Sequence, residues 1–140
     1  MRAWTVLPLV LSLAACASVA PQRESARLAL YRAHAGAPIP SFRYFGRMDS
    51  WESFGDRALA VWTHPGEAYL LDLDGPCEGL DFAIAIGLTA HTGQVSARFD
   101  DVLVRQPGPH IPCRIGTIRP LDVAAIRAAE RARNAQASGT

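Results

Sequence analysis

The chain has 140 residues, 14 cationic side chains that are all arginine, 13 acidic side chains and a formal net charge of +1. Nucleic-acid recognition requires clustered basic residues, so the near-neutral balance excludes it as a function. The length allows one domain with a modest hydrophobic core.

The N-terminus has the pattern of a secretory signal peptide. A charged start precedes the apolar residues 5–15, a run about half as long as the ~20 residues of a membrane-spanning helix. The run ends in Leu13-Ala14-Ala15-Cys16, which resembles a bacterial lipobox. This resemblance implies cleavage before Cys16 and a lipid on that cysteine. The residue after the cysteine is Ala17, and it is not the aspartate that would signal retention in the plasma membrane. The resemblance therefore also implies an anchor in the outer membrane, facing the periplasm.

Four regions are expected along the chain. Residues 1–15 form the signal peptide, and residues 16–40 form a lipidated tether with a short helix at residues 23–34. Fully extended, this tether spans about 80 Å. Residues 41–134 form a single β-rich domain with a C-terminal helix, and residues 135–140 form a frayed tail.

The first half of the domain is predicted to form strands. Residues 41–48 alternate between apolar and polar side chains with the period of a half-buried strand. Residues 58–63 and 67–73 are apolar and are predicted to pair as a hairpin. Pro65 and Gly66 occupy the central positions of the connection, which favours a type II turn.

The second half of the domain is less clearly patterned at its start. Residues 80–90 are a continuous apolar run that periodicity alone does not assign to a helix or to a buried strand. Asp122 is placed to cap a helix over residues 123–134, with Val123 and Ile126 as its core contacts. Further strands are predicted at residues 94–99, 102–105 and 113–119.

These elements indicate a mainly β fold. About six short strands, separated by regular turn signals, favour an antiparallel sheet curled into a small β-barrel. The C-terminal helix and the short N-terminal helix complete the predicted fold. A β-sandwich is the alternative arrangement of the same strands.

The cysteines predict one disulfide. Three cysteines become two once Cys16 carries a lipid, and Cys77 and Cys113 are then an even pair in an oxidising compartment. A metal site and a redox pair are the alternatives. His110 is close to Cys113, but no second close pair accompanies it, and no C-x-x-C motif is present.

The sequence predicts no cofactor, no metal site and no catalytic residue. The four histidines are not paired at metal-ligand spacing. The chain contains no G-x-S-x-G, no H-E-x-x-H and no phosphate-cradling glycine loop. The acid pair Asp100-Asp101 is expected to flank a turn between strands. An enzyme whose site is assembled from distant residues is left open.

Trp51 is the candidate anchor for a partner. It lies in the polar residues 49–56, predicted as a loop, where a large aromatic ring is out of place. Either the ring is exposed and binds a partner, or it folds over the open end of the barrel.

Eight short motifs lie between about residues 30 and 125. They are Ser41-Phe42-Arg43-Tyr44-Phe45, Asp49-Ser50-Trp51, Ala60-Val61-Trp62-Thr63, Ala68-Tyr69-Leu70-Leu71, Gly75-Pro76-Cys77, Val95-Ser96-Ala97-Arg98-Phe99-Asp100, Pro112-Cys113-Arg114-Ile115 and Ile118-Arg119-Pro120-Leu121-Asp122. Together these motifs resemble a family of short Gram-negative bacterial lipoproteins whose function is unknown. The resemblance implies that Cys77 and Cys113 belong to one domain and that the lipobox is typical. It supplies no activity, substrate or site residue.

The function predicted from these features is that of a non-catalytic binding module of the cell envelope. The membrane is contacted through the lipid on Cys16, and the partner is a protein or a cell-wall component. An alternative function is the inhibition of an incoming hydrolase such as lysozyme. The segment 49–81 is rich in acidic side chains, which would attract a basic enzyme. An enzyme with an unrecognised site is the third hypothesis.

Overall fold

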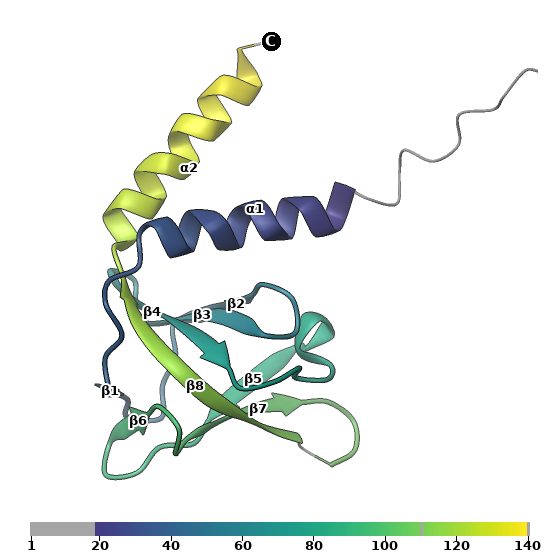
Figure 1. Ribbon diagram of the computed structural model, residues 1–140, viewed down its shortest axis with the longest axis vertical. Coiled ribbons are helices and arrows are strands. Elements are labelled where there is room, and N and C mark those ends of the chain that lie inside the picture. The colour runs from purple at the N-terminus through teal and green to yellow at the C-terminus, as the bar shows by residue number, and fades with distance from the viewer. Residues whose placement is uncertain (1–18, 110, 140) are drawn as a thin grey trace, which may run out of the picture.

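The computed structural model describes residues 19–109 and 111–139 (Figure 1). The predicted signal peptide, the lipidation site Cys16 and His110 lie outside the described residues. The elements in chain order are α1 (Val19–Ala33), β1 (Ser41–Arg43), β2 (Ser50–Ser53), β3 (Ala58–His64), β4 (Glu67–Leu73), the 3-10 helix η1 (Leu80–Phe82), β5 (Ala85–Leu88), β6 (Gln94–Ser96), β7 (Asp101–Arg105), β8 (Ile111–Leu121) and α2 (Val123–Ser138).

Six strands form one antiparallel sheet in the order β2-β3-β4-β8-β7-β5, and β1 pairs with β6 in a second, small sheet. Strand β8 is the longest and joins the two halves of the large sheet. Its start pairs with β7, and its end pairs with β4, with a register shift between Asp72 and Leu73. The sheet curls into a half-barrel, which confirms the predicted curled antiparallel sheet of about six strands.

The sheet buries apolar side chains on both faces. On the inner face of the half-barrel, Leu59, Val61 and Leu71 belong to one cluster, which we call the inner core. On the opposite face, Ala60 and Leu70 belong to a second cluster beneath the helices, which we call the outer core. Alternate residues of β3 and β4 therefore enter different cores, which explains why both strands are almost continuously apolar.

Helix α1 lies over the outer face of the sheet in Figure 1, whereas α2 contacts it only at its start and then points away from the sheet. Tyr31 of α1 is buried in the outer core, with its ring 4.7 Å from that of Phe54 and 6.1 Å from that of Trp62. Arg32 forms an ion pair with Asp72 at 2.6 Å. Helix α1 starts four residues before the predicted position and packs on the domain, so the region expected as a tether contributes to the core.

Helix α2 begins where the sequence predicts. Asp122 is its N-cap, and the side-chain Oδ1 accepts a hydrogen bond from the backbone N–H of Ala125 at 3.0 Å. Val123 and Ile126 are buried in the outer core, as expected. The helix continues to Ser138, beyond the predicted end. Neither helix in the described part of the chain has the length and apolarity that crossing a membrane requires.

The segment after β1 departs from the predicted strand. Only residues 41–43 are extended and paired, while Phe42 and Tyr44 are buried and Arg43 is exposed, as the alternation predicts. Gly46 has φ +76°, a conformation that a side chain disfavours, and the chain turns there. The polar stretch predicted as a loop instead contains β2, the strand at one edge of the sheet.

The β3–β4 hairpin is confirmed, with Leu59 opposite Leu71 and Val61 opposite Tyr69. The predicted turn type is wrong, because Gly66 does not adopt the positive φ of a type II turn. A register shift of one residue near the end of β3 adapts the strand pair to the short connection.

The disulfide between Cys77 and Cys113 is present, with the two Cα atoms 5.6 Å apart. It connects the segment after β4 to β8, and both cysteines belong to the inner core. The ambiguous apolar run that follows resolves into η1 and β5, the second edge of the large sheet.

Candidate functional site

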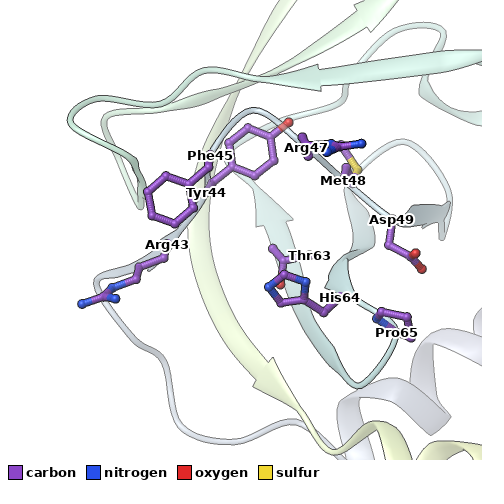
Figure 2. A pocket seen from close by; sticks show the side chains of 9 residues that line it. All are labelled: Arg43, Tyr44, Phe45, Arg47, Met48, Asp49, Thr63, His64 and Pro65. Atoms are coloured by element: carbon purple, nitrogen blue, oxygen red, sulfur yellow. The ribbon is translucent and has the colours of Figure 1, made fainter.

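A groove of about 550 Å³ lies on the surface between residues 43–49 and the end of β3. Figure 2 shows the side chains that surround it, from both of these segments. We call this feature the groove. Its lining residues are Arg43, Tyr44, Phe45, Arg47, Met48, Asp49, Thr63, His64 and Pro65.

The groove has an excess of basic side chains. Arg43, Arg47 and His64 line it, against a single carboxylate at Asp49. Within residues 19–109 and 111–139, the guanidinium groups of Arg43 and Arg47 form no ion pair. Phe45 adds an aromatic ring that is 79% exposed. The rim therefore offers unpaired positive charge beside an apolar surface.

Hydrogen bonds between neighbouring segments hold residues 43–49 in place. The Tyr44 N–H donates to the Gly93 carbonyl at 2.9 Å, and the Asp49 N–H donates to the Trp62 carbonyl at 2.8 Å. Tyr44 is itself buried, which raises the pKa of its hydroxyl, although the charge of Arg105 opposes this shift. Met48 packs against the inner core. The segment has no regular structure, yet it is fixed at both ends.

A chain of polar contacts stabilises the hairpin side of the groove. Glu67 accepts hydrogen bonds from the Tyr69 hydroxyl at 2.8 Å and from the Thr63 hydroxyl at 2.9 Å. These two hydrogen bonds lower the pKa of Glu67, whereas burial and the bond to Glu67 raise the pKa of Tyr69 to about 12. The Tyr69 ring stacks on Phe42 at 4.3 Å. These contacts connect Thr63 and Glu67, which flank the turn, to the inner core, and His64 pairs with Glu67 in the strand ladder.

The chemistry that this arrangement supports is the binding of an anion. Guanidinium groups pair with carboxylate and phosphate oxygens through two parallel hydrogen bonds, and they remain charged at all physiological pH values. The exposed Phe45 ring can cover an apolar part of the same ligand. Arg43, Phe45 and Arg47 of the groove are exposed, so a polymer or a protein segment has access to them.

A second polar cluster surrounds Asp100, a residue that the sequence placed beside a turn. Its side chain is fully buried and accepts hydrogen bonds from the Thr89 hydroxyl at 2.8 Å, the Ser96 N–H at 2.7 Å and His91 Nδ1 at 2.9 Å. Burial alone would raise the pKa of Asp100, but the three hydrogen bonds outweigh it and the pKa is lowered. Two of the donors, Thr89 and His91, follow β5, and the third, Ser96, ends β6. Asp100 directly precedes β7, so its carboxylate holds the connection between β5 and β7 together.

The residues singled out in the sequence are dispersed in the structure. Trp51 lies on β2 opposite Val61 and packs against the inner core with part of its surface exposed, so its role as a partner anchor stays a prediction. Cys77 and Cys113 are joined in the disulfide. Among the residues that the structure describes, no three histidine, cysteine or acidic side chains are close enough to hold a metal ion.

The groove was missed in the sequence because its two sides are distant in the chain. The alternation of residues 41–48 correctly places Arg43 on the solvent side, but a solvated charge and a binding charge have the same pattern. His64 has no partner at metal-ligand spacing in the sequence, so no site is indicated there. The register of the β3–β4 hairpin and the turn at Gly46 bring these groups together, and neither is readable locally.

The comparisons with known proteins identify a family and no activity. No curated protein and no solved structure matches the chain. A family model described as a family of unknown function (DUF6491) matches residues 1–137. The match covers almost the whole chain, so the protein belongs to this family of unknown function, DUF6491.

Proposed function

We propose that the protein is a non-catalytic binding module of the bacterial envelope that holds an anionic envelope component in the groove. The single observation that carries this proposal is the pair of exposed, unpaired guanidinium groups of Arg43 and Arg47, beside His64 and the exposed ring of Phe45. Exposed cations are common on proteins. Here they line a groove whose walls are fixed by hydrogen bonds and core contacts.

The proposed location is the periplasmic face of the outer membrane, with a lipid on Cys16 as the anchor. The lipobox-like Leu13-Ala14-Ala15-Cys16 supports this location. The disulfide between Cys77 and Cys113 supports it further, because such bonds persist in oxidising compartments and are rare in the cytosol.

The test measures retention of the full chain, in detergent, on two envelope fractions. One fraction is isolated cell-wall sacculi, and the other is immobilised, detergent-solubilised envelope protein. The groove variant carries Arg43→Glu and Arg47→Glu. The matched control carries Arg23→Glu and Arg131→Glu, which make the same change in net charge at exposed positions on the helices.

We expect the parent and the helix control to be retained on one fraction, and the groove variant to bind about tenfold more weakly or worse. Reversing two charges at the ligand site costs at least about 1.4 kcal/mol, which is a tenfold change in affinity. The fraction that retains the parent identifies the source of the anion. An equal loss of retention in the groove variant and the helix control would mean that binding depends on net charge and not on the groove, which would overturn the proposal. A parent that binds neither fraction would also overturn it.

A further inference from the structure

Residues 77–84, which follow β4 and include η1, expose two large apolar side chains. Phe82 is 90% exposed and Ile84 is 89% exposed, whereas the flanking Leu80 and Ile86 are buried. We call this segment the Phe82 loop. Single exposed apolar residues are ordinary, but two of them within three residues of one loop make that loop a candidate interaction site.

The Phe82 loop is held rigidly. The disulfide of Cys77 ties its start to β8, and the Cys77 N–H donates to the Asp56 carbonyl at 2.7 Å. Within the loop, the Phe82 N–H donates to the Gly79 carbonyl at 3.2 Å. Gly79 has φ +81°, and a side chain there would collide with Gln106. A rigid loop presents Phe82 to a partner without an entropic cost of ordering.

The surroundings of the two apolar side chains are acidic. Glu78 and Asp81 belong to the loop, and the contact between Cys77 and Asp56 brings a third carboxylate close by. Burial and the neighbouring Asp56 charge raise the pKa of Asp81. Two cations lie nearby, because Arg57 follows Asp56 and Arg105 of β7 pairs with Ala85 of β5. The three carboxylates of Glu78, Asp81 and Asp56 outnumber them. An anionic lipid surface would be repelled by these carboxylates, whereas a basic protein surface would be attracted.

The loop leads directly into a free sheet edge. Among the described strands, β5 pairs only with β7. The hydrogen bond from the Thr89 N–H to the Asp101 carbonyl shows which residues of β5 direct their backbone groups toward β7. By the alternation of an antiparallel ladder, the backbone groups of Ile86 and Leu88 point to the unpaired edge. A lipid surface cannot satisfy these groups, whereas an extended protein segment can.

From this juxtaposition we propose that the Phe82 loop and the edge of β5 form a docking surface for an extended, basic segment of a partner protein. The partner's backbone pairs with Ile86 and Leu88. Its apolar side chains pack on Phe82 and Ile84, and its cations meet Glu78 and Asp81. The Phe82 loop is separate from the hairpin side of the groove, because the Asp56 contact and His64 lie at opposite ends of β3.

The test places the photoreactive residue p-benzoylphenylalanine at position 82 of the full chain, in the cells that produce the protein. The matched position is Phe99, which is 75% exposed and precedes the end of β7 distant from the loop. A second variant adds Glu78→Gln and Asp81→Asn to the position-82 chain. Because Phe82 and Glu78 are exposed, none of these changes removes a core contact.

We expect one discrete protein adduct from position 82, none of the same size from position 99, and an adduct weaker by about fivefold or more in the second variant. The cross-linked peptide should carry arginine or lysine close to the adduct. The proposal is overturned if position 82 yields no protein adduct, or if the adduct is unchanged by the second variant. Binding of the full chain to protein-free anionic vesicles, lost on Phe82→Ser, would point to a lipid surface and also overturn it.

Discussion

Asp100 is the only fully buried charged side chain among the residues that the structure describes. Removing an ionised carboxylate from water is costly unless hydrogen bonds replace the lost hydration. Three donors do so here, and two of them, the Thr89 hydroxyl and the Ser96 N–H, are themselves part-buried. The His91 ring covers the open side of the carboxylate, although most of the ring is exposed. We therefore assign Asp100 a structural role.

Asp100→Asn is expected to lower the free energy of unfolding by about 2 kcal/mol at pH 7. The substitution places an amide NH₂ where a carboxylate oxygen now accepts hydrogen bonds, so a donor then faces donors. The folded state lowers the pKa of Asp100. Its stabilisation is thus fully present above the unfolded pKa of about 3.9 and disappears as pH falls through the lower folded pKa. Urea unfolding of both proteins at pH 7 and near pH 3 measures this difference.

The matched control is Asp101→Asn, which removes the exposed ion pair between Asp101 and Arg114. Exposed pairs contribute about 1 kcal/mol or less. A difference between the parent and Asp100→Asn that stays constant down to pH 3 would contradict the assigned role of the carboxylate.

At the scale of elements, α1 is attached to the sheet by one aromatic side chain and a charged network. Arg27 forms two hydrogen bonds with Glu52 of β2, at 2.7 and 2.9 Å, and the Tyr31 hydroxyl donates to the same carboxylate at 3.3 Å. Arg27 also lies 3.2 Å from Glu130 of α2, an ion contact without hydrogen-bond geometry. Both helices and an edge strand therefore share one cluster.

Tyr31→Ala is expected to lower the free energy of unfolding by about 3 kcal/mol, because it removes a buried ring from the outer core. Tyr31→Phe keeps the ring and loses only the hydrogen bond to Glu52, which costs about 1 kcal/mol. Arg23→Ala, on the exposed side of α1, should change stability by less than about 0.5 kcal/mol. Urea unfolding ranks the three variants, and an equal loss from all three would show that α1 does not contribute through Tyr31.

The docked α1 also bears on the proposed anchor. A chain that is free from residue 16 to residue 40 would extend about 80 Å. Since the helix starts at Val19 and packs on the sheet, residues from Val19 onward do not supply that reach. If Cys16 carries the lipid, the domain is expected to lie close to the bilayer surface.

At the scale of the whole molecule, the disulfide crosses the sheet from the loop after β4 to β8. Cys77 and Cys113 enclose a loop of 37 residues (113 − 77 + 1), from the sequence separation of 36. In the chain-entropy model, such a loop stabilises the fold by about 4 kcal/mol. Because Cys77 also starts the Phe82 loop, the same bond orders the proposed docking surface.

Cys113→Ser is expected to lower the melting temperature by roughly 10–20 °C under oxidising conditions. Thermal unfolding followed by circular dichroism measures the shift. The parent with a reducing agent is the matched control and should melt near the variant. Equal melting temperatures of the oxidised parent and the variant would mean that the bond contributes nothing to stability.

The elements that the sequence predicted well are those with a strong local pattern. The β3–β4 hairpin follows from two apolar runs around Pro65 and Gly66, and the start of α2 follows from the cap at Asp122. Strand β2 was missed because it lies at a sheet edge beneath α1, where polar side chains such as Glu52 are tolerated. Its pairing with β3 outweighs its local composition.

The sequence by itself determined the mainly β fold, the disulfide partners, the position of the β3–β4 turn and the cap of α2. Each of these depends on residue types at short spacings or on the parity of cysteines. The tertiary structure decided the burial of Asp100, the groove around Arg43 and His64, and the exposure of Phe82. These depend on strand register and sheet curvature, which bring together residues distant in the chain. Local periodicity carries no information about such contacts.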